Sequence, residues 1–226
     1  MSLENSCFLF DIDGTLVDLH HLWEKAYRDA YQQLTGVTLQ QEEYRILFSN
    51  PDLVGHKIIL EKKVMYTPEA VLLLARGGQK LARENFAGDL TSYVLPGVQE
   101  ILSSLSAEQA TLATATGNTQ NLAELILQNS GLRDYFSLMG CAEENTKSKA
   151  EIVERVLQNY TQQGKIFDKW KTYMIGDTPS DIRAAQGNGI VSIAVATGYF
   201  SSEELAKEKP DYVLKDLREM RGIIWV

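Results

Sequence analysis

Four aspartates in this chain stand in two pairs whose spacing suits chemistry with a bound cation. Asp11 and Asp13 follow the apolar run CFLF, and Asp177 and Asp181 follow the apolar run TYMI. A structural turn requires only one Asp or Asn and a Gly, so these acids exceed what a turn needs. Four carboxylates brought together repel one another and shift one another's pKa. A positive charge is therefore expected among them.

Magnesium is the cation that best fits such a set of oxygen ligands. Zinc is not expected, because no His or Cys accompanies the acids, and His20, His21 and His56 lie in another segment. A metal held by carboxylates is typical of sites that handle phosphate, where one acid attacks phosphorus and a second handles the proton of the leaving group. Gly14 would let the chain turn closely under the phosphate, with free backbone N–H groups for its oxygens.

The elements that must position these residues alternate between strand and helix patterns. Apolar runs bounded by turn signals predict buried strands at residues 7–10, 110–116, 172–175, 191–197 and 212–214. Amphipathic patterns predict helices at residues 96–106, 118–131, 148–160 and 179–189. The alternation predicts an α/β fold with a doubly wound parallel sheet. The carboxyl ends of its strands would gather the polar residues at one edge.

Residues 19–92, which we call the insert, interrupt this alternation. Helical spacing recurs there and no strand pattern appears, which predicts an all-helical cap domain inserted into an α/β core of residues 1–18 and 93–226. Asp18 is a candidate N-cap of the first insert helix. Gly77 and Gly78 are expected to break or bend the last one.

The composition limits which binding partners and which cellular compartment are expected. The chain has 226 residues and a formal net charge of −8, which disfavours a nucleic acid or an anionic membrane as partner. Its two cysteines, Cys7 and Cys141, form no CxxC pair and indicate no disulfide framework. No apolar run is long enough to span a membrane, and the first residues lack a basic signal-peptide region. We expect a cytoplasmic protein, monomeric or weakly dimeric, acting on a small phosphorylated metabolite.

Four motifs, DIDGTLVD, TATGN, KSKAEIV and GDTPSD, occur in the order found in the haloacid dehalogenase (HAD) superfamily. Over its whole length the chain resembles the phosphoglycolate-phosphatase-like branch of that superfamily, with a HAD-like Rossmannoid core, and the insert resembles its helical C1 cap. The resemblance implies that Asp11 is the nucleophile and a Mg²⁺ ligand. It implies that Asp13 is the general acid and base, with its backbone carbonyl on the metal. Asp177 would bind Mg²⁺, and Asp181 would hold the metal or its waters.

The same resemblance assigns roles to residues that bind the phosphoryl group. Thr116 would donate a hydrogen bond to a phosphoryl oxygen, and Gly117 and Asn118 would offer nearby backbone N–H groups. Asn118 is also a candidate helix N-cap. For Thr15, beside Gly14, two interpretations stay open: a hydroxyl that stabilises the turn, or a contact with the phosphate. A lysine would balance the charge on Asp11. Lys149, which stands against the start of a helix, is preferred over Lys147.

The expected function is a Mg²⁺-dependent phosphatase that hydrolyses a small phosphomonoester through an aspartyl-phosphate. A dehalogenase has no leaving oxygen to protonate, and Asp13 argues against it. A phosphomutase of the β-phosphoglucomutase type stays open. So does a phosphonate hydrolase, which would need a cap lysine such as Lys25 or Lys57. A non-catalytic phosphate-binding module would be expected to lose these acids, and all of them are present.

Overall fold

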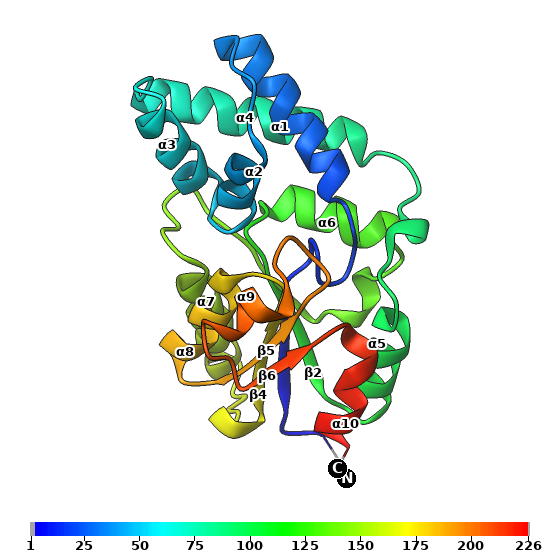
Figure 1. Ribbon diagram of the computed structural model, residues 1–226. Coiled ribbons are helices and arrows are strands. Elements are labelled where there is room, and N and C mark those ends of the chain that lie inside the picture. The colour runs from blue at the N-terminus through cyan, green and yellow to red at the C-terminus, as the bar shows by residue number, and fades with distance from the viewer. Residues whose placement is uncertain (1–2, 226) are drawn as a thin grey trace.

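A parallel sheet of six strands forms the lower half of the molecule (Figure 1). The computed structural model describes residues 3–225, and residues 1, 2 and 226 of the predicted core lie outside the described residues. The strand order is β3-β2-β1-β4-β5-β6, so the chain winds outward from β1 in both directions. The strands are β1 Cys7–Phe10, β2 Thr111–Ala115, β3 Leu138–Gly140, β4 Thr172–Gly176, β5 Val191–Val195 and β6 Tyr212–Leu214. The predicted α/β fold with a doubly wound parallel sheet is confirmed.

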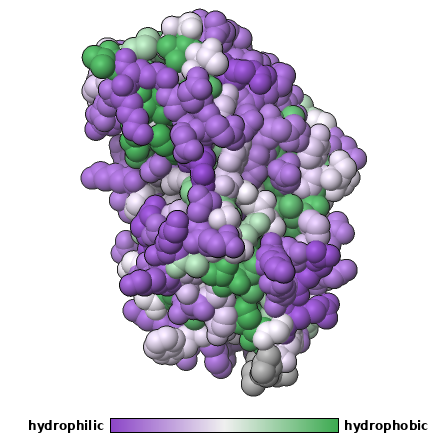
Figure 2. Space-filling view, viewed as in Figure 1, coloured by the Kyte–Doolittle hydropathy of each residue, from purple (hydrophilic) through white to green (hydrophobic). Residues whose placement is uncertain are grey.

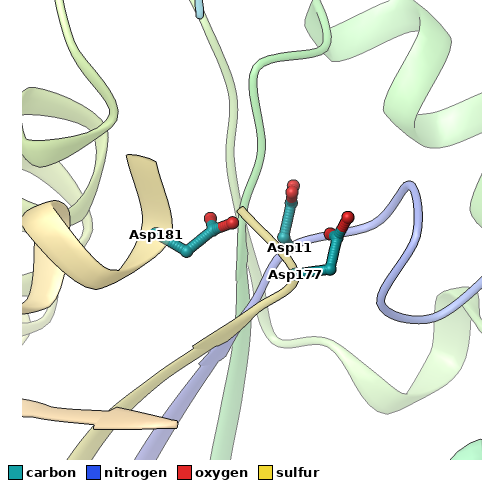
Figure 3. Close-up of side chains that lie close together, drawn as sticks. All are labelled: Asp11, Asp177 and Asp181. Atoms are coloured by element: carbon teal, nitrogen blue, oxygen red, sulfur yellow. The ribbon is translucent and has the colours of Figure 1, made fainter. Parts of the chain in front are cut away.

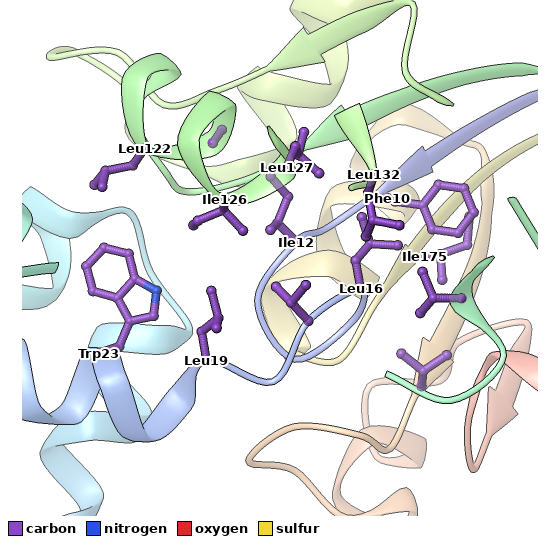
Figure 4. Packing of buried hydrophobic residues seen from close by; sticks show 14 of the residues in the cluster. Phe10, Ile12, Leu16, Leu19, Trp23, Leu122, Ile126, Leu127, Leu132 and Ile175 are labelled. Atoms are coloured by element: carbon purple, nitrogen blue, oxygen red, sulfur yellow. The ribbon is translucent and has the colours of Figure 1, made fainter. Parts of the chain in front are cut away.

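The central strand, β1, is buried on both faces, as its unbroken apolar run predicts. Phe8 and Phe10 belong to the large core that also holds α5 and α6 side chains, while Cys7 and Leu9 pack with α7 and α8 on the other face. These flanking helices are α5 Val98–Ala107, α6 Gln120–Asn129, α7 Lys149–Gln162 and α8 Pro179–Asn188. Figure 4 shows Ile12 beside Leu127 of α6, and Phe10 beside Leu132, which follows that helix.

Strand register sets the level at which the polar residues leave the sheet. Phe10 pairs with Thr114 of β2 on one side and with Ile175 of β4 on the other. The three central strands therefore end within one or two residues of each other. The residues that follow these ends, Asp11, Thr116 and Asp177, emerge at one edge of the sheet.

The insert contains four helices, which lie above this edge in Figure 1. They are α1 His20–Thr35, α2 Gln41–Phe48, α3 Asp52–Lys62 and α4 Pro68–Asn85. Their apolar faces join the same hydrophobic core as the strands: Trp23 of α1 packs edge-to-face on Phe86 beside α4, and Figure 4 shows Trp23 near Leu19 and Leu122. The division into a cap of residues 19–92 and a core stays a prediction.

Three local predictions were wrong. Gly77 and Gly78 do not break a helix, because α4 runs through them, and a Cβ at Gly78 would lie 2.9 Å from the Tyr27 ring. These glycines allow α1 and α4 to pack closely. Asp18 does not cap α1, whose N-cap is Leu19; its carboxylate contacts His20 instead. The N-cap of α6 is Thr119 and not Asn118, whose side chain donates to Asp13 in the site.

The sheet also holds a strand that the sequence did not predict. β3 has only three residues, and two of them are only half-buried, so it lacks the continuous burial of the central strands. The remaining elements are short: α9 Ser202–Ala206, α10 Arg221–Ile224, and 3-10 turns η1 Thr91–Tyr93, η2 Arg133–Tyr135, η3 Lys169–Lys171 and η4 Leu217–Met220.

The surface is mainly hydrophilic on the face drawn in Figure 2. Exposed apolar side chains cluster at the turn between α3 and α4, where Val64 is 93% exposed and Tyr66 is 42% exposed. Among the described residues, no helix combines the length and the apolar character that crossing a bilayer requires.

Candidate active site

Asp11 lies at the floor of a cavity of about 60 Å³ between the sheet edge and the insert. Its Oδ2 is 2.7 Å from Nζ of Lys149, which is the first residue of α7. The same Nζ donates to Oδ1 of Asp181 at 2.6 Å. Lys149 is buried and lines the cavity, whereas Lys147 is exposed and lies outside it. The structure thus brings Lys149, and not Lys147, to the aspartates.

Asp11, Asp177 and Asp181 form a cluster that suits a cation (Figure 3). One carboxylate oxygen from each lies within 4.8 Å of the other two, and all three residues are buried. Oδ2 of Asp177 is buried without a hydrogen-bond partner among the described residues. An unpaired buried carboxylate oxygen is costly unless a positive charge meets it. The donor set is all oxygen, as Mg²⁺ prefers. The residues present therefore fit the predicted metal.

The electrostatics of the cluster agree with this fit. Burial, followed by the negative charges of Asp11 and Asp181, raises the pKa of Asp177 to about 8. Burial raises the pKa of Asp11 to about 7, although Lys149 opposes that rise. Burial would lower the pKa of Lys149, but the charges of Asp11 and Asp181 outweigh it and raise that pKa. One lysine does not balance three acids, so a cation would complete the site.

Local backbone features allow the acids to approach this closely. Gly14 has a φ of +75°, and a Cβ there would lie 2.4 Å from Oδ2 of Asp177. A Cβ at Gly176 would lie 2.1 Å from Cγ of Asp181. Oδ2 of Asp181 accepts from the backbone and the hydroxyl of Thr178, which caps the start of α8. The helix start thus fixes Asp181 in the cluster.

Asp13 has a different environment from Asp11, although only one residue separates them. Its Oδ1 accepts from Nε1 of Trp23 at 2.8 Å and its Oδ2 accepts from Nδ2 of Asn118 at 2.5 Å. Its side chain is not part of the three-acid cluster. Burial raises the pKa of Asp13, against these two hydrogen bonds. A carboxyl group that is held away from the cluster and whose pKa is raised suits proton transfer.

Of the other residues predicted to contact phosphate, some line the cavity and others have their donor groups bonded within the protein. Thr116 and Gly117 line the cavity. The backbone N–H of Asn118 donates to Oγ1 of Thr116, so it is not free. The backbone N–H of Gly14 donates to the carbonyl of Val17, and this group is not free either. The hydroxyl of Thr15 donates to Oδ1 of Asp177 at 3.0 Å, so Thr15 holds an acid of the cluster.

A family model of haloacid dehalogenase-like hydrolases matches residues 8–195, which is more than half of the chain. The chain belongs to this family. The predicted resemblance to the HAD superfamily is therefore confirmed.

Relatives of this hydrolase carry several different names. A phosphoglycolate phosphatase of Vibrio parahaemolyticus is 26% identical over 221 residues, which cover 96% of this chain and 95% of that protein. The pyrophosphatase PpaX of Oceanobacillus iheyensis is 22% identical over 221 residues, with 96% and 95% covered. A solved β-phosphoglucomutase from Clostridium difficile has a TM-score of 0.81 at 17% identity, covering 95% of this chain and 92% of that one. This last likeness shows the shared fold.

The insert supplies site residues that the sequence did not single out. His20, Trp23 and Tyr27 of α1 and Asp52 of α3 line the cavity. Burial lowers the pKa of His20, but its hydrogen bond to Asp18 and the charges of Asp177 and Asp13 outweigh this and raise that pKa. Helical periodicity alone would assign Trp23 and Tyr27 to the core, because no local signal shows that they reach the site.

The insert lysines named for a phosphonate hydrolase lie elsewhere. Lys25 contacts Asn85 and Asp29, and Lys57 pairs with Glu61. Neither lysine lines the cavity among the described residues. No insert lysine is therefore placed to act on a substrate in this cavity.

Proposed function

We propose that this HAD-family hydrolase is a Mg²⁺-dependent phosphatase that hydrolyses a small phosphomonoester through an aspartyl-phosphate on Asp11. The observation that carries the proposal is the separation of the two acids of the first motif. Asp11 contacts Lys149 and lies in the three-acid cluster that suits a cation. Asp13 lies outside that cluster and accepts hydrogen bonds from Trp23 and Asn118. Two carboxyl groups in different environments suit two different roles.

In the first step a carboxylate oxygen of Asp11 attacks phosphorus, and the bond from phosphorus to the leaving oxygen breaks. Protonated Asp13 donates its proton to that oxygen, which leaves as an alcohol. Lys149 offsets the negative charge that gathers on Asp11 and the phosphoryl group. Asp11, Asp177 and Asp181 would hold Mg²⁺, which supplies charge neutralisation for the phosphoryl oxygens.

In the second step Asp13, now a carboxylate, takes a proton from water as the water attacks the phosphoryl group. The bond between phosphorus and Asp11 breaks, and inorganic phosphate and a free carboxylate remain. Trp23 and Asn118 keep Asp13 facing the cavity during both transfers. A phosphomutase would use the same first step but would return the phosphoryl group to a sugar, so release of inorganic phosphate separates the two reactions.

The test is phosphate release from p-nitrophenyl phosphate and a panel of small phosphomonoesters, with Mg²⁺ and with EDTA. We expect release that requires Mg²⁺ and falls by at least about 10³-fold in Asp11→Asn, because the nucleophile is lost. Circular dichroism of the variant checks that it is folded. Substantial turnover in folded Asp11→Asn would contradict the role of that residue.

A further inference from the structure

The wall that the insert contributes to the cavity carries an acid, Asp52. It is the first residue of α3 and it lines the cavity above Asp11. Asp52 and Gln79 also line a second cavity of about 180 Å³ between the insert and the core. The two cavities share further lining residues, including Pro51, Gly117 and Thr119. Asp52 therefore stands where a leaving group would pass from one cavity into the other.

A series of contacts joins Asp52 to the proton-transfer residue. Trp23 donates to Asp13 and stacks on Tyr27, with ring centroids 5.2 Å apart. The hydroxyl of Tyr27 donates to Oδ1 of Asp52 at 2.9 Å. An ester whose leaving oxygen lies at Asp13 would extend along the rings of Trp23 and Tyr27 toward Asp52. The carboxylate of Asp52 thus faces the distal part of the alcohol and not the phosphate.

Asp52 is built to remain charged in this position. Oδ2 accepts from Nε2 of Gln79 at 2.8 Å, and Nε2 of His56 lies 3.3 Å from Oδ1. Burial would raise the pKa of Asp52, but the adjacent imidazole of His56 and the hydrogen bonds from Gln79 and Tyr27 outweigh it and hold that pKa below its usual range. Its side chain is 14% exposed, so water screens its charge only partly.

Beyond the His56 imidazole that lies against Asp52, the charges that line the two cavities do not reverse the sign of this wall. In the first cavity, the basic side chains among the described residues are Lys149 and His20, and His20 lies against Gly14, beside the three acids. In the second cavity Arg76 is accompanied by Glu143 and Glu144. The path of the leaving group is therefore net acidic. A second anionic group on the substrate would meet like charge there, which disfavours binding.

We propose that Asp52 sets the substrate class: phosphomonoesters whose alcohol part donates a hydrogen bond and carries no second negative charge. This inference rests on the proposed function. It separates the chain from relatives named for phosphoglycolate and pyrophosphate, whose leaving groups are anionic at neutral pH.

Three esters of equal chain length test the proposal: 2-aminoethyl phosphate, 2-hydroxyethyl phosphate and carboxymethyl phosphate, which is 2-phosphoglycolate. We measure kcat/KM for each at about pH 8, where the carboxyl group of the carboxymethyl ester is fully ionised. We expect the carboxymethyl ester to be at least about tenfold poorer than the hydroxyethyl ester, with the aminoethyl ester at least as good as the latter. In Asp52→Asn, the difference in kcat/KM between the carboxymethyl and hydroxyethyl esters should shrink about tenfold.

Glu61→Gln is the matched control, because it removes the same charge from the exposed side of the same helix and should keep the native ratio. Equal or better use of the carboxymethyl ester by the native protein overturns the proposal, even if Asp52→Asn does not fold. An unchanged ratio in folded Asp52→Asn overturns it too. The proposal is also overturned if the native protein hydrolyses p-nitrophenyl phosphate but turns over none of the three esters. If the native protein does not hydrolyse p-nitrophenyl phosphate, the proposed function is overturned, and this inference with it.

Discussion

At the scale of single residues, the two lysines at the start of α7 have different environments. Lys149 is buried between Asp11 and Asp181, whereas Lys147 is exposed. We predict that Lys149→Met lowers kcat/KM by about 10²–10³-fold, because the charge on the attacked phosphoryl group loses its partner. Lys147→Met is the matched control and should stay within about twofold of the native value. A larger loss in the Lys147 variant would reverse the assignment.

Trp23 is a positioning residue for the proton transfer. Trp23→Phe keeps an aromatic ring against Tyr27 and Phe86 but removes the N–H that holds Asp13. A hydrogen bond to a charged group contributes about 1.5–3 kcal/mol, so we predict a fall in kcat of about tenfold or more with KM nearly unchanged. Trp170→Phe, at a side chain that is 79% exposed, should leave both constants unchanged. A rise in KM alone would show that Trp23 only shapes the cavity.

Sequence reasoning found the residues of the four core motifs and missed those that reach the site from the insert helices. Asp11 and Asp177 stand directly after apolar runs, so strand pairing alone brings them together. Asp52 and Trp23 reach the cavity only through the way α1 and α3 pack, which periodicity does not specify. Asn118 reads as a helix cap locally, but Asp13, 105 residues away, takes its side chain.

At the scale of elements, an ion pair links the insert to the core. Arg45 of α2 contacts Oε1 of Glu204 in α9 at 2.6 Å, and its guanidinium lies 4.6 Å from the ring centroid of Phe200. Both charged side chains are partly exposed, so water screens the pair and it stabilises this contact only weakly. The contact favours the arrangement in which the insert covers the cavity.

We therefore predict that Arg45→Met raises KM by about two- to fivefold, while kcat stays the same or rises slightly if opening limits product release. The steady-state constants for a small phosphomonoester check this expectation. Arg28→Met on α1 removes an exposed charge paired with the adjacent Asp29, and it should change neither constant. An equal effect of both substitutions would mean that general charge, and not the link, is responsible.

The bounds of the helices and strands show which of them are determined by the local sequence and which by tertiary packing. β1 and β6 have the predicted bounds, since each is a compact apolar run between turn signals. β3 was missed because its partner β2, and not its own sequence, makes it a strand. The α4 helix continues through Gly77 and Gly78 because packing on α1 outweighs the low helix propensity of glycine.

At the scale of the whole molecule, the acid cluster links stability to pH and to metal. The pKa of Asp177 is raised to about 8 in the folded protein, so the folded state favours the protonated form. Without metal, the free energy of unfolding should fall as the pH rises from about 4, the unfolded value, through about 8. Urea unfolding in EDTA across this range measures the change.

Asp177→Asn should weaken this dependence, since it removes one of the two acids whose pKa is raised into this range and leaves Asp11. Mg²⁺ should raise the melting temperature of the native protein, because a ligand that binds only the folded state stabilises it, and should not raise that of the variant. A pH dependence that is equal in both proteins, or an equal shift with Mg²⁺, would contradict the assignment of Asp177 to the metal site.

The most direct test of the central claim is to trap the phosphoryl group on Asp11. Asp13→Asn is mixed with Mg²⁺ and p-nitrophenyl phosphate, whose leaving group needs no proton, and intact mass is measured at short times. We predict that the variant gains one phosphoryl group, because water attack now lacks its base, and that the double variant Asp11→Asn, Asp13→Asn gains none. Labelling of the double variant, or no labelling of folded Asp13→Asn, would contradict an aspartyl-phosphate on Asp11.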